Sequence, residues 1–234
     1  ENRDGGNNNC SYNYGGEGPS IDPVLESIRE RQLKNFFATL MVSLGTPMIL
    51  GGDEIARTQN GNNTAYCQDN GISWYAWTLL EKNRGLYRFV KEMISFRLRH
   101  PGFMRPEFYT GRDGNYNAIP DISWFNEKGV APDWDKIGYC LALQINGRRA
   151  DVLRDKDDAD FFIMFNAGLD PVVFYVTAAG DRKTWFRAVD TSFNSPNDIL
   201  PAGTEAVLPN QHKYTVKARS MAILISKSAQ GTAV

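Results

Sequence analysis

Residues 45–54 read Gly-Thr-Pro-Met-Ile-Leu-Gly-Gly-Asp-Glu, and they decide the fold class of this chain. The apolar run at 48–50 is typical of a short parallel strand covered on both faces, and Gly51-Gly52 lets the backbone turn tightly where that strand ends. An amphipathic helix precedes the stretch, and a polar loop and a second helix follow it. This order is typical of a parallel (β/α)8 barrel, or TIM barrel, whose active site lies at the carboxyl ends of the strands. It therefore predicts an enzyme that processes a sugar or another metabolite.

Two helices are predicted around this strand. The first has Asp22 as its N-cap and Pro23 at its first helical position. Its apolar residues, Phe36 among them, recur mainly at three- and four-residue steps and form one stripe that should face a sheet. Its charged residues, including Lys34, are expected on the solvent side. The second helix spans residues 86–99 and is stopped by a Pro-Gly pair.

The second half of the chain has a different pattern. Gly, Pro and Asn become frequent, and apolar runs of strand length alternate with turn residues, which predicts an antiparallel β-sandwich. The expected strands are residues 138–145, 161–165, 172–176, 185–189, 214–216 and 221–225.

The predicted fold class is therefore α/β plus all-β, in two domains. Residues 1–105 should form the C-terminal part of a (β/α)8 barrel, with its last strand and helices. Residues 106–234 should form a C-terminal antiparallel β-sandwich domain. A complete barrel needs about 200 residues or more, so the first domain is too short to close one.

The composition argues against several functional classes. The 234 residues carry 26 basic and 27 acidic side chains without a sustained run of either sign, so nothing favours nucleic acid or an anionic membrane as a partner. No apolar stretch approaches the roughly 18 residues of a transmembrane helix, and the N-terminal residues do not resemble a secretory signal. The three cysteines lack Cys-x-x-Cys spacing, which argues against a disulfide framework or a zinc site. We expect no metal and no cofactor.

Histidines and one charged segment offer little catalytic chemistry. His100 and His212 are the only histidines, and we expect structural or surface roles for both, which leaves little for a Ser-His-Asp centre. Residues 148–160 are rich in aspartate and could hold a cation, but a solvated hairpin loop is the preferred interpretation.

Aromatic residues stand among Asn, Gly and Gln in the polar loops. Aromatic faces beside amide side chains suit a pyranose, which has an apolar C–H face and a rim of hydroxyls. An equally good interpretation is that the rings anchor long loops to the scaffold. The long loop at 53–83 has a length typical of functional loops or of loops with helical turns of their own. The aromatic residues concerned are Tyr12, Tyr14, Tyr66, Trp74, Tyr75 and Trp77.

The loop also contains a specific run, Gln-Asn-Gly-Asn-Asn-Thr-Ala-Tyr-Cys-Gln-Asp-Asn at 59–70, followed by Ser73-Trp74. Together with shorter motifs elsewhere, this run resembles the isoamylase-type debranching enzymes of the α-amylase superfamily, which act on starch or glycogen. The resemblance is close over residues 1–100 and looser beyond. The shorter motifs are Asn2-Arg3-Asp4-Gly5, Glu17-Gly18-Pro19, Arg31-Gln32, Gly45-Thr46-Pro47-Met48, Gly52-Asp53-Glu54, Trp185-Phe186-Arg187 and Val189-Asp190-Thr191.

The resemblance implies hydrolysis of α-1,6-glucosidic branch points with retention, which needs a nucleophilic carboxylate and a carboxylic acid about 5–5.5 Å apart. In the family these two groups come from earlier barrel strands, and a third aspartate follows a histidine near the seventh strand. None of these three catalytic carboxylates is carried over to this chain. Asp53 and Glu54 are neighbours that would point in opposite directions on an extended backbone. Asp4 and Asp69 have no evident pocket that would raise a pKa. We therefore expect no catalytic residue here.

The same resemblance implies that the loop after the eighth strand rims the glucan cleft. Asp53 and Glu54 would stand at the strand end, and we expect Glu54 to bond loop amides instead of substrate. Asp69-Asn70 could equally form a turn that bonds its own backbone. The candidate glucan-facing residues are Asn63, Tyr66, Gln68 and Asp69.

The expected function is thus the C-terminal portion of a glycogen or starch debranching glycoside hydrolase, inactive as this chain alone. The alternatives are a non-catalytic α-glucan-binding accessory protein, or part of another α-amylase-superfamily hydrolase or transferase. The expected partners are a branched α-glucan (glycogen, amylopectin or limit dextrin) and either the missing N-terminal part of the barrel or another copy of the chain, because one strand with two helices leaves apolar surface exposed. We expect a bacterial cytoplasmic or plastid location, without secretion.

Overall fold

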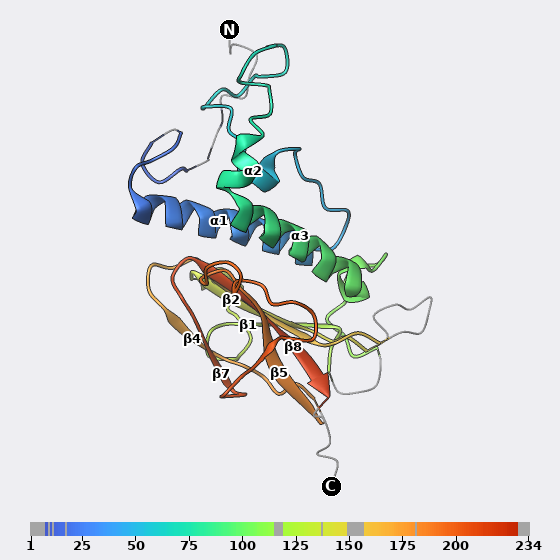
Figure 1. The fold of residues 1–234 in the computed structure, drawn as a ribbon. Coiled ribbons are helices and arrows are strands. Elements are labelled where there is room, and N and C mark those ends of the chain that lie inside the picture. Colours follow the sequence, from blue (N-terminus) through green and yellow to red (C-terminus); the bar gives the residue numbers. More distant parts are fainter. Residues whose placement is uncertain are drawn as a thin grey trace.

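The computed structural model shows three layers: helices over one face of a large sheet, and a small sheet over its other face (Figure 1). The motif residues 2–5 and Glu17 lie outside the described part of the chain, as does most of the acidic segment at 148–160. The division into domains at residue 105 stays a prediction. The structure describes residues 8, 10, 12–16, 18–114, 119–136, 138–148, 157–180 and 182–228.

Both predicted helices are present. Helix α1 spans Pro23–Val42, and its N-cap Asp22 accepts a hydrogen bond from the Val24 N–H at 2.9 Å. Helix α3 spans Arg84–Arg99, and the two helices lie side by side above the sheet (Figure 1). The shorter helical elements are η1 (Asp53–Ile55), α2 (Thr78–Lys82), η2 (Pro101–Met104) and η3 (Trp134–Lys136).

The antiparallel strands predicted in the second half are confirmed, with small shifts of their ends. The six-stranded sheet has the order β1-β2-β3-β8-β5-β6, and β4 pairs with β7 in a second sheet. Strands β1 and β6 were not predicted from the sequence; both lie at the edges of the sheet and have no fully buried residue, so their apolar signal is weak. The strands are β1 (Ile122–Phe125), β2 (Cys140–Ile145), β3 (Phe161–Asn166), β4 (Val172–Tyr175), β5 (Lys183–Asp190), β6 (Ala206–Val207), β7 (Lys213–Val216) and β8 (Ser220–Ser228).

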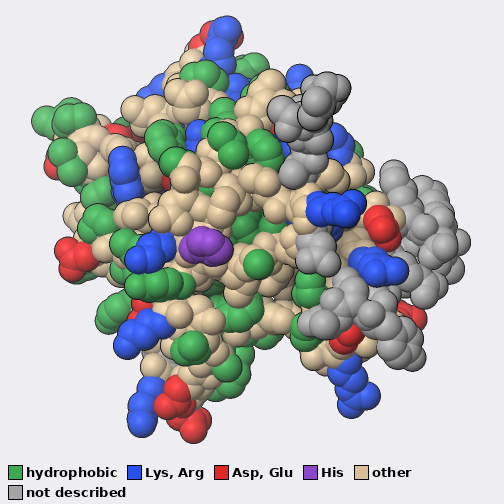
Figure 2. Space-filling view, turned by 90° about the horizontal axis from the view of Figure 1, so that it is seen from below, with side chains coloured by type: hydrophobic (Ala, Val, Ile, Leu, Met, Phe, Trp, Pro, Cys, Tyr) green, Lys and Arg blue, Asp and Glu red, His purple; other side chains and the backbone are tan. Residues whose placement is uncertain are grey.

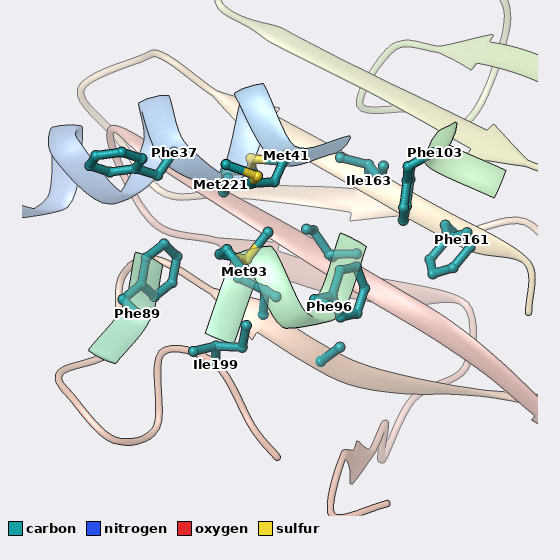
Figure 3. Packing of buried hydrophobic residues seen from close by; sticks show 14 of the residues in the cluster. Phe37, Met41, Phe89, Met93, Phe96, Phe103, Phe161, Ile163, Ile199 and Met221 are labelled. Atoms are coloured by element: carbon teal, nitrogen blue, oxygen red, sulfur yellow. The ribbon is translucent and has the colours of Figure 1, made fainter. Parts of the chain in front are cut away.

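Two hydrophobic cores hold the layers together. The first lies between the helices and the large sheet, where Met41 of α1 and Met93 of α3 meet Met221 of β8 (Figure 3). The second lies between the two sheets and centres on Phe162 and Trp185. Because each fully buried side chain of this size contributes about 1.5–3 kcal/mol, the first core is what fixes the helices on the sheet.

Two residues of α1 lie on the opposite side from the one predicted. Phe36 was placed in the buried stripe but is exposed. Lys34 was placed on the solvent side but is only 3% exposed, because its ammonium group forms ion pairs with Glu30 at 2.8 Å and with the buried Asp198 at 2.9 Å. A long lysine side chain can enter a core when its charge meets a carboxylate there.

The strand predicted at residues 48–50 is not formed, and this part of the prediction is wrong for the described chain. A strand is defined by its neighbours, and no described segment pairs with residues 48–50. Burial on both faces is also absent: Met48 is 88% and Leu50 61% exposed, whereas Ile49 packs against the helix–sheet core.

Arg97 of α3 fixes the backbone that leads into this segment. Its guanidinium donates hydrogen bonds of 2.7 Å to the carbonyl oxygens of Met41, Ser43 and Gly45 at the end of α1. A cation at a helix C-terminus satisfies carbonyls that have no partner within the helix. Burial lowers the pKa of Arg97.

The described part of the acidic segment serves the fold. Asp158 bonds the His100 ring nitrogen Nδ1 at 2.7 Å, which gives that histidine a structural role. Asp160 accepts from the Lys183 ammonium at 2.6 Å and from the Gly147 N–H at 2.9 Å. Among the described residues no group of three or more His, Cys, Asp or Glu side chains could hold a metal ion.

On the face opposite the helices, the described residues form no patch of one charge sign. In Figure 2, which looks at the molecule from below, charged side chains of both signs are dispersed toward the rim, with hydrophobic side chains between them. None of the described helices is long and apolar enough to cross a membrane.

Candidate functional site

The loop that follows residue 50 projects from the helical layer on the side away from the sheet (Figure 1). The loop starts at Gly51 and Gly52, and at both positions neighbouring side-chain atoms come too close to leave room for a Cβ. A Cβ at Gly51 would lie 2.7 Å from the Tyr75 hydroxyl oxygen, and one at Gly52 would lie 2.6 Å from Cδ of Arg57. Gly52 also has φ 98°, a left-handed conformation that glycine adopts without strain. The Gly-Gly pair thus allows the loop to fold back over its own start.

Arg57 closes this fold-back. Its guanidinium donates to the carbonyl oxygens of Ile72 at 3.2 Å and Ser73 at 3.0 Å, and it lies over the Tyr75 ring at 5.2 Å from the centroid. Charge-assisted hydrogen bonds and a cation–π contact together hold the two ends of the loop in one arrangement. The sequence analysis did not select Arg57, because a lone arginine gives no signal until its partners across the loop are known.

Asp53 and Glu54 stand on the short helix η1, not on the extended backbone that the sequence analysis assumed. The Gly52 N–H donates to Oε2 of Glu54 at 2.9 Å. Burial is the main cause that raises the pKa of Asp53; the adjacent Glu54 adds to this, and the Arg57 charge opposes it. Both carboxylates therefore belong to the tight turn at the start of the loop.

The structure places the four predicted glucan-facing residues on one stretch of this loop, where three of them bond inside it. Oδ1 of Asn63 accepts from the Thr64 hydroxyl at 3.3 Å, and the Gln68 amide donates to the Thr64 carbonyl at 3.0 Å. The Trp74 indole N–H donates to Oδ1 of Asp69 at 2.8 Å. Tyr66 is exposed. Their contact with a glucan stays a prediction.

Tyr75 and Trp77 form a feature that the sequence analysis noted only as loop aromatics. Their rings are stacked, with centroids 5.7 Å apart and an interplanar angle of 21°, and both are exposed. A near-parallel ring pair is a flat apolar platform of the kind that can lie against the C–H face of a sugar. In the sequence, the two-residue spacing of Tyr75 and Trp77 was the available signal for such a pair. Which faces of the two rings are exposed depends on how Arg57 folds the loop back.

Two open apolar grooves flank the extended segment at 46–50. One, of about 280 Å³, lies against α1 and includes Phe36, Met48 and Asp53 in its lining. The other, of about 680 Å³, lies against α3 and includes Ile94, Leu98 and Met104. The segment thus stands between two shallow apolar troughs, an arrangement that leaves room for further chain on both sides.

Known proteins with similar sequence or structure agree with the earlier resemblance. Residues 121–225 match the family model "Isoamylase, C-terminal". A glycogen operon protein GlgX homolog of Mycobacterium tuberculosis is 39% identical over 238 residues, covering 95% of this chain and 31% of that protein. A chloroplastic isoamylase 3 of Oryza sativa subsp. japonica is 36% identical over 225 residues, covering 96% of this chain and 26% of that protein.

A pullulanase from Bacillus acidopullulyticus has a similar fold, with a TM-score of 0.62 at 15% identity, over 89% of this chain and 21% of that one. At this identity the likeness concerns the fold alone. The chain spans less than a third of the length of these curated relatives. The resemblance stated from the motifs is confirmed: residues 121–225 belong to the isoamylase C-terminal family, and the chain is a relative of the isoamylase-type debranching enzymes of the α-amylase superfamily.

Proposed function

We propose that this chain is the C-terminal part of a glycoside hydrolase that cleaves α-1,6 branch linkages of glycogen or starch with retention. The names of its relatives support this activity, and their greater length supports a catalytic region outside these 234 residues. The observation that carries the proposal concerns the segment at 46–50, whose side chains alternate as in a barrel strand but which pairs with no strand among the described residues.

The pattern of that segment is the alternation of a strand. Ile49 faces the helices and packs on the core, whereas Met48 and Leu50 face the other way and are exposed. In a barrel, alternate residues of each strand point to the surrounding helices and to the apolar interior. Among the described residues, no acceptor is found for the N–H groups of these three residues. Adjacent parallel strands would supply those acceptors and would cover Met48 and Leu50.

In the complete barrel, the loop after this strand would stand at the carboxyl end of the strands, where the active site lies. Asn63, Tyr66, Gln68 and Asp69 would then rim the glucan cleft, with Asp53 and Glu54 behind them. The nucleophile and the acid would come from strands outside this chain, so the chain by itself binds at most and does not hydrolyse. The proposed location is the bacterial cytoplasm or the plastid stroma.

The test compares this chain with a longer protein that includes the upstream coding region. We expect the longer protein to release linear chains from amylopectin, measured as new reducing ends and as a shift of iodine absorbance, and the 234-residue chain to release none. Turnover by the short chain that is abolished by Asp53→Asn or Glu54→Gln would refute the proposal, as would an inactive but folded longer protein.

The exposed stacked pair Tyr75–Trp77 favours a second candidate, a glucan-binding accessory protein without catalysis. Such a protein needs a sugar platform but no barrel. Retention of the chain on immobilised amylopectin, together with a longer protein that binds but does not debranch, would favour this second candidate.

A further inference from the structure

Two tryptophans at the edge of the large sheet form a second exposed aromatic surface, in a different part of the chain from the projecting loop. Trp124 lies on the edge strand β1 and Trp134 on the turn η3 that follows it. The two rings meet edge to face, with centroids 5.7 Å apart and an angle of 74°. Trp124 is 37% and Trp134 58% exposed. Contiguous exposed apolar surface of this kind can mark a binding site.

The indole groups have unused hydrogen-bonding capacity. Within the described residues, neither the Trp124 nor the Trp134 indole N–H donates a hydrogen bond, whereas Trp74 and Trp185 each donate one, to Asp69 and to the Thr177 carbonyl. Trp is a donor only, and a tryptophan whose N–H has no protein partner can offer it to a ligand oxygen. The pair therefore presents apolar faces together with two N–H donors that have no partner among the described residues.

The turn at 126–130, which lies between the two tryptophans, is held in place by hydrogen bonds before any ligand arrives. The Asn126 side chain accepts from the Lys128 N–H at 2.9 Å, and the Asn126 N–H donates to the Val130 carbonyl at 2.9 Å. The Tyr175 N–H of β4 donates to the Glu127 carbonyl at 2.9 Å, which ties the turn to the second sheet. A surface ordered in this way loses little conformational entropy on binding.

The charge around the pair selects the class of ligand. Asp133 and Asp135 stand beside Lys136 on the same turn, and Asp133 pairs with Lys136 at 3.8 Å. This mixture of signs offers no field that would attract a polyanion or a polycation. A neutral chain with apolar faces and hydroxyl oxygens, which is what an α-glucan presents, complements both the rings and their N–H groups.

We propose that Trp124 and Trp134 form an accessory binding site for an outer α-1,4-glucan chain, separate from the projecting loop. One sugar would lie on the exposed face of Trp134, and the indole N–H groups would donate to sugar hydroxyl oxygens. Such a site would keep the protein on a branched polymer between cleavage events. The choice of an α-glucan as the ligand rests on the proposed debranching function.

The experiment measures retardation of the 234-residue chain in native gels with increasing glycogen, with glycogen-free gels as reference. We expect Trp134→Ala to weaken the apparent affinity by about three- to tenfold, the range expected for one aromatic stacking contact. The matched control is Phe108→Ala, which removes another exposed aromatic ring and should leave retardation unchanged. Equal melting temperatures of the three proteins would show that each is folded.

Two outcomes would overturn the inference. If Trp77→Ala abolishes the retardation and Trp134→Ala leaves it intact, glucan binding lies on the projecting loop alone. The other outcome is that glycogen does not retard the wild-type chain, that this chain sediments as a dimer, and that Trp134→Ala dissociates the dimer. This would show that a second copy of the chain covers the tryptophan pair. Neither result bears on debranching, because release of linear chains by the longer protein is measured separately.

Discussion

Replacing the buried Asp198 by alanine should destabilise the chain more than any exposed charge replacement. Asp198 has no exposed surface and ties the helical layer to the segment after β5. Its Oδ2 pairs with the Lys34 ammonium at 2.9 Å, and its Oδ1 pairs with the Arg88 guanidinium and accepts from the Ile199 N–H at 3.0 Å. The substitution would leave the Lys34 charge buried with Glu30 as its remaining partner.

The size of the effect follows from that remaining partner. Breaking a buried ion pair by removing one member costs about 3–5 kcal/mol, because the other charge is left uncompensated. Glu30 is half exposed and keeps part of the compensation, and the 28%-exposed Arg88 can turn toward water, so we expect a loss near the lower end, about 3 kcal/mol. For a chain of this length the melting temperature falls by about 2–4 °C per kcal/mol, which predicts a decrease of about 6–12 °C.

Urea unfolding followed by circular dichroism measures the loss. The exposed pair of Asp133 and Lys136 supplies the control, since Asp133→Ala should change the free energy of unfolding by no more than about 0.5 kcal/mol. Adding Lys34→Met to Asp198→Ala should recover part of the loss, because the uncompensated charge is then gone. The reasoning is wrong if Asp198→Ala costs less than about 1 kcal/mol, or if the double variant shows the sum of the two single losses.

Three further substitutions test the helix–sheet core, the loop start and the second core. Met93→Ala should lower the free energy of unfolding by about 2–5 kcal/mol, because Met93 is fully buried. Its neighbour Ile94 is partly exposed, so Ile94→Ala should cost clearly less, and equal losses in urea unfolding would contradict the packing described. Gly52→Ala should loosen the projecting loop, since the new Cβ meets Arg57 and φ is 98°, and limited proteolysis should then cut the loop faster; unchanged cleavage would argue against the fold-back. Burial, and then the Asp190 carboxylate, raise the pKa of Tyr214 above its ordinary value of about 10, so the folded state keeps this proton more firmly than the unfolded state. The contribution of Tyr214 to stability is therefore complete below about pH 10 and is lost as the pH rises further. Tyr214→Phe should make the fall of the melting temperature at alkaline pH shallower, and an identical fall in both proteins would refute this direction.

Helix starts and strand patterns could be predicted from the sequence because short-range interactions decide them. Asp22 caps α1 through a hydrogen bond to a residue two positions away, and the apolar runs of β3 and β8 are long enough to show burial without knowledge of the fold. The half-buried residues of β1 carry too weak an apolar signal, and only pairing with β2 makes them a strand.

The candidate site, too, could be predicted from the sequence only in part. The run at 59–70 and the Gly51-Gly52 pair pointed to the loop, and the structure explains the glycines by the approach of Tyr75 and Arg57. Which faces of the stacked Tyr75 and Trp77 rings are exposed depends on how Arg57 folds the loop back, and the contact between the Trp124 and Trp134 rings joins positions that no local pattern connects.

The amino-acid order alone determined where helices begin, which runs are apolar, and which family the motifs belong to, since each depends on neighbours along the chain. Only the tertiary structure decided that Lys34 is buried and that residues 48–50 form no strand. The physical reason is that burial of a charge depends on a carboxylate brought from far along the chain, and a strand exists only when another backbone accepts its N–H groups.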